Sequence, residues 1–356
     1  MGTTVEKLTK VLETKEAIRT SINNKGGTLT ESDTFSSYST AIDNIQTGSG
    51  ENPLQLYLDT RKSASYLFVS SYWFSGITSY FGFDTMSDET LEAIIANISF
   101  SNVIEMRSMF DGCKALTSIP QLDTSKVTNM SYMFRDCTNL ITIPQLDTSS
   151  VNRMTRMFYG CSNLTSIPQL DTSSVTNMDE IFYNCSSLTT IPQLDTSNVI
   201  NMTSMFQHCS NLTTIPQLDT SSVTDMGYMF YGCSSLTSIP ALDASKVTGM
   251  GYMFYQCYKL EKIDITKLSN TGGFANGCYS LKTLIIRTMD TIPSLNSEAF
   301  TDCYHFYGRT NATYNPEGLK DGAIYVPDNK VEELKVATNW SVFADIIKPL
   351  STLVEE

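Results

Sequence analysis

The sequence has little of what an enzyme or a nucleic-acid-binding protein needs. Its 356 residues include only two histidines, His208 and His305. No nucleophile elbow, paired-histidine metal motif, phosphate-binding glycine loop or EF-hand loop occurs. Basic residues are also scarce, because 24 Lys and Arg face 37 Asp and Glu and leave a formal charge of −13. A polyanion is repelled by such a chain. We therefore expect neither enzymatic activity nor nucleic-acid binding.

Long apolar runs are missing as well. No stretch approaches the ~20 apolar residues that a membrane span requires, so no membrane insertion is expected. The first residues also lack the apolar core of a secretory signal, since Lys7, Lys10 and Glu13 interrupt it. This pattern favours a protein that is assembled in the cytoplasm and released on a particle.

What the chain does have is a repeat. Nearly every position around seven of its cysteines returns after 24 residues. In a stacked array each such position forms a column, with one member per coil. The cysteine column comprises Cys113, Cys137, Cys161, Cys185, Cys209, Cys233 and Cys257.

Each repeat has two halves with different apolar periods. In the first half, Met130, Met133, Phe134 and Cys137 follow the spacing of a short helical turn. The second half, Leu-Thr-x-Ile-Pro-x-Leu, predicts one short strand of a parallel ladder that ends at the proline. The predicted fold class is an α/β repeat solenoid. It is a leucine-rich-repeat-like coil with one short parallel strand and one short helical turn per 24-residue unit, preceded by two short N-terminal helices.

The ends of the chain differ from the array. Residues 1–50 predict two amphipathic helices and a linker that serve attachment or oligomerisation. Residues 51–105 are interpreted as degenerate N-terminal capping repeats, 106–310 as the array and 311–356 as a C-terminal cap. The apolar residues expected to mediate attachment are Leu8, Leu12, Ile18, Ile22, Phe35 and Ile42.

Two columns have chemistry that needs an interpretation. Stacked cysteines lie about one coil spacing of ~5 Å apart, too far for disulfides, so we expect buried and reduced thiols. Carboxylates at the same spacing either cap turn N–H groups or hold calcium between them. Capping is the favoured interpretation and no cofactor is expected, with calcium as the alternative. The carboxylates are Asp123, Asp147, Asp171, Asp195, Asp219 and Asp243.

Two further columns are expected to be exposed. Stacked tyrosines combine apolar rings with a polar tip, and a neighbouring glutamine strip offers uncharged hydrogen-bonding groups. We hypothesise that they form a receptor surface, and the alternative is a solvated ladder with ordinary packing between coils. The tyrosines are Tyr132, Tyr159, Tyr183, Tyr228, Tyr231, Tyr252 and Tyr255, and the glutamines are Gln121, Gln145, Gln169, Gln193 and Gln217.

The repeat resembles a known family. The run M-x-x-M-F-x-x-C-x-x-L-T-x-I-P-x-L-D-T-S-x-V-T is similar to the leucine-rich repeats of BspA-type surface proteins, in their Met-Phe-rich variant. Asn23-Asn24-Lys25-Gly26-Gly27 and the following segment look like leader segments of phage tail and appendage proteins from Gram-positive hosts. Such appendages are commonly homo-oligomers, so the resemblance implies an oligomer, with a trimer as the expected order.

These observations predict a non-enzymatic virion appendage, a tail, baseplate or head fibre, whose array recognises the host cell surface. The expected partners are a surface glycan or protein and, through the N-terminal helices, other virion proteins. The alternatives are a BspA-like adhesin on a bacterial cell surface and a purely structural fibre or decoration protein without a ligand.

Overall fold

The structure is a computed structural model that describes residues 19–20, 23, 88, 99–315 and 317–354. Apart from residues 19–20 and 23, which are helical, the predicted helices of 1–50 lie outside the described residues, as do most of the capping repeats. The chain divides into two compact units, Met1–Ser174 and Val175–Glu356, which we call unit 1 and unit 2 and describe separately. The domain boundaries predicted at residues 50, 105 and 310 stay predictions.

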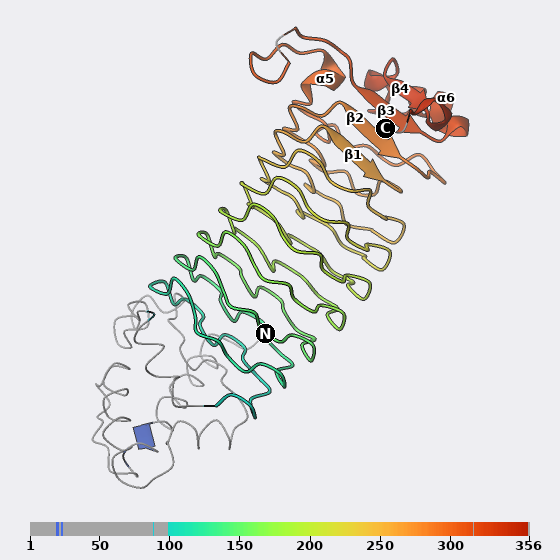
Figure 1. The fold of residues 1–356 in the computed structure, drawn as a ribbon. Coiled ribbons are helices and arrows are strands. Elements are labelled where there is room, and N and C mark those ends of the chain that lie inside the picture. The colour runs from blue at the N-terminus through green and yellow to red at the C-terminus, as the bar shows by residue number, and fades with distance from the viewer. Residues whose placement is uncertain (1–18, 21–22, 24–87, 89–98, 316, 355–356) are drawn as a thin grey trace. The chain divides into compact units, whose positions relative to one another are not determined.

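Within each unit the repeats form stacked coils (Figure 1). In unit 1 the N–H of Met106 donates to the carbonyl of Asn129 at 3.0 Å, and that of Phe110 donates to Met133 at 2.9 Å. In unit 2 the N–H of Met202 donates to Asp225 at 3.1 Å. Residues one repeat apart thus lie side by side, which confirms the repeat solenoid.

The helical turn predicted for the Met-Phe half is wrong. In unit 1, Ser108 and Gly112 have φ angles of 54° and 76°, in the left-handed region. Two such residues per coil interrupt the i to i+4 bonds of a helix. The chain instead makes tight turns, such as Met109 N–H to Met106 carbonyl at 3.2 Å, and alternate N–H groups donate to the next coil. The Met-Phe half therefore joins coils to one another rather than forming a helix.

The predicted strand in every unit is also wrong for the proline-containing coils. In unit 2, the N–H of Thr237 donates to Thr213 in the preceding coil at 3.1 Å, and Pro240 then offers no N–H. Within the described residues, regular strands begin at Lys262, after the last proline of these coils. β1 (Lys262–Ile265), β2 (Thr283–Ile286), β3 (Ala323–Val326) and β4 (Ile347–Pro349) form one parallel sheet in that order.

The core consists of the predicted apolar columns. In unit 2, Phe182, Phe206 and Phe230 are fully buried and stack with centroid distances of 5.7 and 5.6 Å. Phe110 and Phe134 stack in the same way in unit 1, at 5.5 Å. Large buried aromatic surfaces dominate such a core, because each removes a whole side chain from water.

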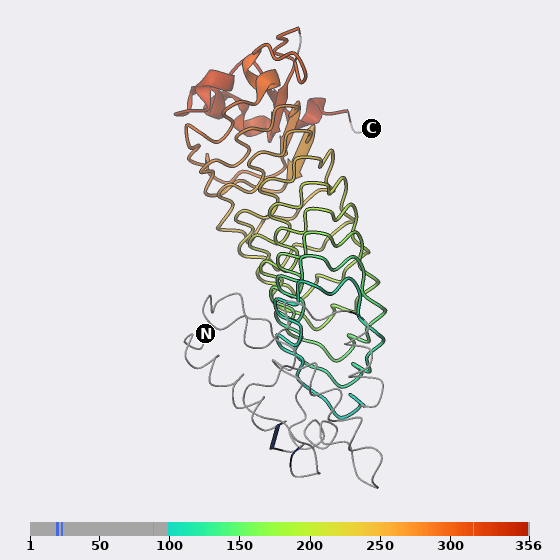
Figure 2. The same ribbon diagram turned by 90° about the vertical axis from the view of Figure 1, so that its left-hand side faces the viewer.

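The C-terminal residues close unit 2. Figures 1 and 2 show α5 (Tyr304–Tyr307), α6 (Val331–Val336) and short 3₁₀ turns gathered around the last strands. The turns span Asp328–Lys330, Ser341–Phe343 and Leu350–Thr352. Phe343 packs edge-to-face on Phe300 at 5.6 Å, and the buried Trp340 donates its indole N–H to Pro293. No helix in the described part of the chain is long and apolar enough to cross a membrane.

Candidate recognition surface

Four tyrosines of two neighbouring coils form one block in unit 2. Tyr228 stacks on Tyr252 at 5.3 Å, and Tyr231 stacks on Tyr255 at 4.7 Å. The two stacks lie next to each other, with centroids of Tyr228 and Tyr231 at 6.0 Å and of Tyr252 and Tyr255 at 5.7 Å. The structure thus brings together four of the seven predicted tyrosines. We call these four the tyrosine block.

The turns of each coil position the block. Tyr228 and Tyr252 occupy the left-handed position of their coils, with φ angles of 58° and 56°. The same turns place Phe230 and Phe254 in the core. The tyrosines on either side of these phenylalanines are partly exposed, and Tyr228 is the most exposed at 40%. Core phenylalanines and surface tyrosines therefore alternate within a few residues.

The prediction missed four tyrosines that continue this aromatic surface. Tyr258 stacks on Tyr279 at 4.7 Å, Tyr279 on Tyr304 at 5.0 Å, and Tyr314 lies against Tyr279 at 4.9 Å. Burial raises the pKa of both Tyr258 and Tyr279, and neighbouring tyrosines add to the effect. Three of these tyrosines directly follow Cys257, Cys278 and Cys303. This shared position after a cysteine could have predicted that they form a column.

His208 lies between two tyrosines of unit 2. Its ring packs edge-on against Tyr183 at 5.9 Å and Tyr231 at 5.1 Å. Gly232 makes room for it, because a Cβ there would come within 2.7 Å of the imidazole Nδ1. Burial lowers the pKa of His208, so the ring is neutral near pH 7.

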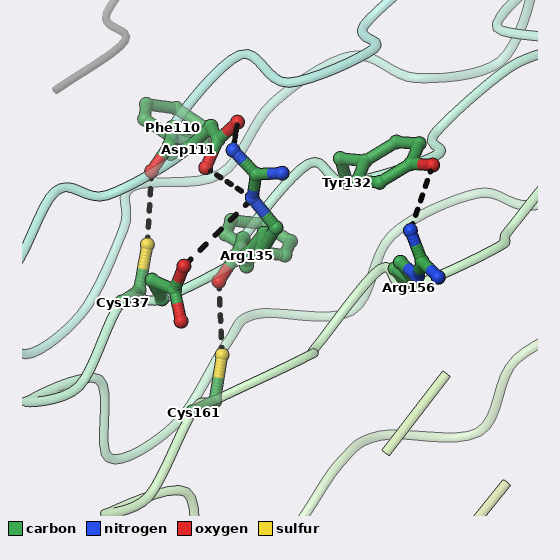
Figure 3. Close-up of polar contacts among 9 residues, drawn as sticks. Phe110, Asp111, Tyr132, Arg135, Cys137, Arg156 and Cys161 are labelled. Atoms are coloured by element: carbon green, nitrogen blue, oxygen red, sulfur yellow. Dashed lines mark hydrogen bonds and ion pairs between the residues drawn. The ribbon is translucent and has the colours of Figure 1, made fainter. Parts of the chain in front are cut away.

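Tyr132, in unit 1, has a different environment (Figure 3). Only 9% of it is exposed, and the guanidinium carbons of Arg107, Arg135 and Arg156 lie 5.0, 5.4 and 5.8 Å from its ring centroid. Arg135 is held by a two-point hydrogen bond to the buried Asp111, at 2.8 and 2.6 Å. Tyr132 therefore offers its ring to arginines rather than to solvent. Tyr159, also in unit 1, is partly exposed.

The glutamines are exposed, but their amides join coils. In unit 1 the side-chain amide of Gln121 donates to the carbonyl of Gln145 at 2.7 Å. In unit 2 the amide of Gln193 donates to Gln217 at 2.7 Å, and that of Gln217 to Ala241 at 3.1 Å. A side chain thus supplies a donor directly after Pro120, Pro192 and Pro216, where the backbone lacks one. The amide nitrogens are committed to the fold.

The aspartate column lies beside the glutamines. In unit 1, Gln121, Gln145, Asp123 and Asp147 line a shallow groove of about 480 Å³. Asp147 accepts bonds from the N–H of Ser149 at 3.0 Å and from its hydroxyl at 2.6 Å. These bonds hold the pKa of Asp147 below its ordinary value. The same turn forms at Asp123, Asp171, Asp195 and Asp219 with both donors of the serine two residues on, and at Asp243 with the serine N–H.

The capping interpretation of the aspartates is therefore confirmed. Among residues 99–315 and 317–354, no group of three or more His, Cys, Asp or Glu side chains is arranged to hold a metal ion.

All nine cysteines are buried and unpaired, as predicted. Seven of these thiols also donate a hydrogen bond to a backbone carbonyl, a role that the sequence did not indicate. In unit 1, Cys137 donates to the carbonyl of Phe110 at 2.9 Å, and in unit 2, Cys209 donates to Phe182 at 3.1 Å (Figure 3 shows the unit 1 bonds). Burial raises the pKa of Cys209 to about 12. These thiols are protonated hydrogen-bond donors within the core.

The two histidines do not form a catalytic group. His305 is buried, with Nδ1 2.6 Å from Asp321 and Nε2 3.0 Å from the carbonyl of Tyr314. Across the described residues, no serine, threonine or cysteine is hydrogen-bonded to His208 or His305. His305 instead ties the loop that carries Tyr314 to α5.

The comparison with protein families identifies the repeat. The family described as "Mycoplasma protein of unknown function, DUF285" matches residues 79–190 and 161–268. Together the two matches cover more than half of the 356 residues. The chain belongs to the DUF285 family. No curated protein matches the sequence.

Several solved structures are similar to this DUF285 protein. A leucine-rich repeat protein of T. pallidum has 23% identity and a TM-score of 0.34, covering 43% of this chain and 69% of its own. A leucine-rich cell surface protein of Faecalibacterium prausnitzii has 19% identity and a TM-score of 0.24, covering 66% and 78%. A leucine-rich repeat protein of Bacteroides ovatus has 15% identity and a TM-score of 0.24, covering 70% and 81%. Similarity at this level transfers no ligand or activity.

Proposed function

We propose that this protein is a non-enzymatic recognition protein whose exposed tyrosine columns bind a partner on a cell surface. The observation that carries the proposal is the tyrosine block, which presents four aromatic side chains on two coils of unit 2. Tyrosine is a common contact residue because it buries a large rigid ring while keeping a polar tip. The buried thiols and the capped aspartates, in contrast, are engaged within the fold.

The coils suit this role because they hold the side chains rigidly. In unit 2 the N–H of Tyr228 donates to Gly251 at 3.0 Å, and that of Tyr231 donates to Tyr228 at 3.1 Å. A surface that is ordered before binding loses little conformational entropy when a partner docks. Support for binding therefore comes from both the residue types and the backbone that positions them.

The setting of the protein is a narrower proposal. As an adhesin it acts on a bacterial cell surface, and as a virion appendage it attaches a particle to its host. In the virion setting residues 1–50 provide the attachment to other virion proteins and the trimer contacts. The third alternative is a purely structural protein without a ligand, and binding to cells would exclude it.

The test is binding of the fluorescently labelled full chain to cells of candidate hosts. Saturable binding that unlabelled protein displaces is the expected result, and no displaceable binding to any cell would overturn the proposed function. Blocking of phage adsorption by the purified protein would support the virion setting. Detection of the protein on intact bacteria by a specific antibody would support the adhesin setting.

A further inference from the structure

The tyrosine block has free polar tips. Within the described residues, no hydrogen bond engages the hydroxyls of its four members, Tyr228, Tyr231, Tyr252 and Tyr255. Each phenol hydroxyl both donates and accepts hydrogen bonds. Because the rings stack at 4.7 and 5.3 Å, pairs of hydroxyl-bearing rings recur at the coil spacing. A partner that fits them needs donors and acceptors repeated along one direction.

Several ring faces in the block are already covered. Stacking covers one face of each tyrosine, and Tyr252 also lies against Gly273, where a Cβ would come within 2.5 Å of its ring. Tyr228 is the most exposed of the four. The corresponding residue in the preceding coil is the small Ser204, and 40% of Tyr228 is exposed. The block therefore presents the open face of Tyr228 and a set of ring edges with hydroxyls.

The turns of the block carry neutral side chains, apart from Asp225, whose carboxylate accepts the N–H of Gly227 at 2.8 Å. Burial and then other tyrosines, rather than any charged side chain, raise the pKa of Tyr231. The adjacent His208 is neutral near pH 7, as described above. Gln256, which follows Tyr255, and Gln207, which occupies the position of Tyr231 in the preceding coil, are neutral amides. An anionic polymer would leave its solvation shell here without gaining an opposite charge.

We propose that the tyrosine block binds a neutral, linear polysaccharide. One sugar ring packs on the open face of Tyr228, and the hydroxyls of the following sugars bond to the phenols of the neighbouring rings. A polysaccharide supplies apolar C–H faces, hydroxyl donors and acceptors, and a regular repeat. This inference rests on the proposed function, since it names the class of surface molecule that the array recognises.

A protein partner fits these features less well. Protein surfaces carry charges of both signs, and those facing the block would be desolvated without a counter-charge. Their hydrogen-bonding groups also lack a repeat along one direction. We therefore treat a protein partner as an outcome that the experiment distinguishes.

The test is calorimetric titration of the full chain with cello-, chito- and malto-oligosaccharides of increasing length. At least one series binds, and its affinity rises with chain length, because each added sugar reaches another hydroxyl. Tyr228→Ala lowers that affinity about threefold to tenfold, the value of one aromatic stacking contact. Ile200→Ser, which changes an exposed apolar side chain outside the block, leaves the affinity unchanged.

A second variant guards against a folding defect. Changing all four tyrosines of the block to phenylalanine keeps the rings and their stacking and removes only the hydroxyls. This variant unfolds like the parent protein and binds the oligosaccharide at least about threefold more weakly, because neutral hydrogen bonds are each worth ~1 kcal/mol. Unchanged affinity in both variants, or no binding to any neutral series, would overturn the inference.

The two proposals fail in different ways. If the protein binds cells but no neutral oligosaccharide competes, recognition stands and the polysaccharide inference falls. Loss of cell binding after the cells are treated with protease would identify a protein partner and would also overturn the inference. If no cell is bound at all, the proposed function itself fails.

Discussion

Two regions of unit 2 solve the same stacking problem differently. The coils between residues 175 and 242 contain a proline in each second half, and their backbone ladder stops there. The coils from residue 260 onwards lack that proline and pair as β1, β2 and β3. In the first region Gln193 and Gln217 supply side-chain donors after the proline. In the second region, backbone N–H groups donate to the neighbouring strand instead.

The difference extends to charge. Asp264 lies in β1 and is buried, and Arg287, just after β2, binds it through two hydrogen bonds of 2.8 and 2.7 Å. The proline-containing coils of unit 2 have neutral glutamines on the equivalent side. A continuous sheet thus positions an ion pair, whereas the interrupted ladder leaves an uncharged strip. The presence or absence of one proline per coil therefore decides whether backbone or side-chain donors join the coils.

The largest expected effect comes from putting a proline into the regular sheet. Ile285→Pro in β2 should destabilise unit 2 by about 5 kcal/mol, roughly 3 from the lost donor and ring clash and 2 from lost burial. Denaturant titration measures the free energy of unfolding of each variant. Ile285→Val, which should cost about 1 kcal/mol, is the matched control. A loss for Ile285→Pro no greater than for the valine variant would show that β2 does not depend on its backbone ladder.

Removing one core ring should be nearly as costly in either region. Phe206 is stacked face to face at 5.6 Å with Phe230, whereas Phe274 meets Phe254 edge-to-face at 5.3 Å. Phe206→Ala and Phe274→Ala should each destabilise by about 4 kcal/mol, because both rings are fully buried. Ring geometry changes this by no more than ~1 kcal/mol. Unfolding midpoints that differ by much more would show that stacking geometry, and not burial, stabilises the coils.

Converting a proline coil towards a regular one should change stability little. Pro216→Val adds a backbone donor worth about 1 kcal/mol but loses about the same through a more flexible unfolded chain. Gln217→Ala alone should cost about 1 kcal/mol, because its amide bonds to Ala241 and Leu218 are lost. In the Pro216→Val background this cost should shrink. A double-mutant cycle measures the coupling, and strict additivity would contradict the idea that glutamine replaces the missing backbone donor.

The smallest expected effect is acid sensitivity. Bonds from Ser221 hold the pKa of Asp219 below its ordinary value. Its stabilising contribution is therefore present above the unfolded carboxyl value of about 4 and is lost as the pH falls through the lower folded value. Melting temperatures across this acidic range should fall slightly less for Asp219→Asn, whose amide oxygen still accepts the bonds. Parallel pH profiles for the variant and the parent protein would contradict the capping role.

Much of the fold could be predicted from the 24-residue spacing. Burial of Phe206 and Cys209 and the turn at Asp219 followed from columns that had to stack. The helical turn was predicted wrongly, because apolar spacing reports which residues point inward and is the same for a helix and for a run of tight turns. Left-handed conformations at Ser204 and His208 carry no such signal, since neither residue is glycine.

The candidate surface was predicted less completely. Tyr228, Tyr231, Tyr252 and Tyr255 were identified from their columns, and Tyr258 and Tyr279 were missed where the spacing of cysteines changes from 24 to 21 and then 25 residues. Tyr132 belongs to the same column as Tyr228, yet its neighbours include three arginines. Sequence position places a side chain in a column, and only the neighbouring coils decide what covers it.

By itself the sequence determined that the chain stacks as coils, which columns are apolar and inside, and that its thiols stay unpaired, because a strict repeat makes identical residues neighbours at a fixed spacing. The tertiary structure alone decided where backbone ladders form, which side chains replace them and which tyrosine faces stay open. Those outcomes depend on left-handed turns, on prolines that remove donors and on contacts between successive coils, and none of these interactions is contained within a single repeat.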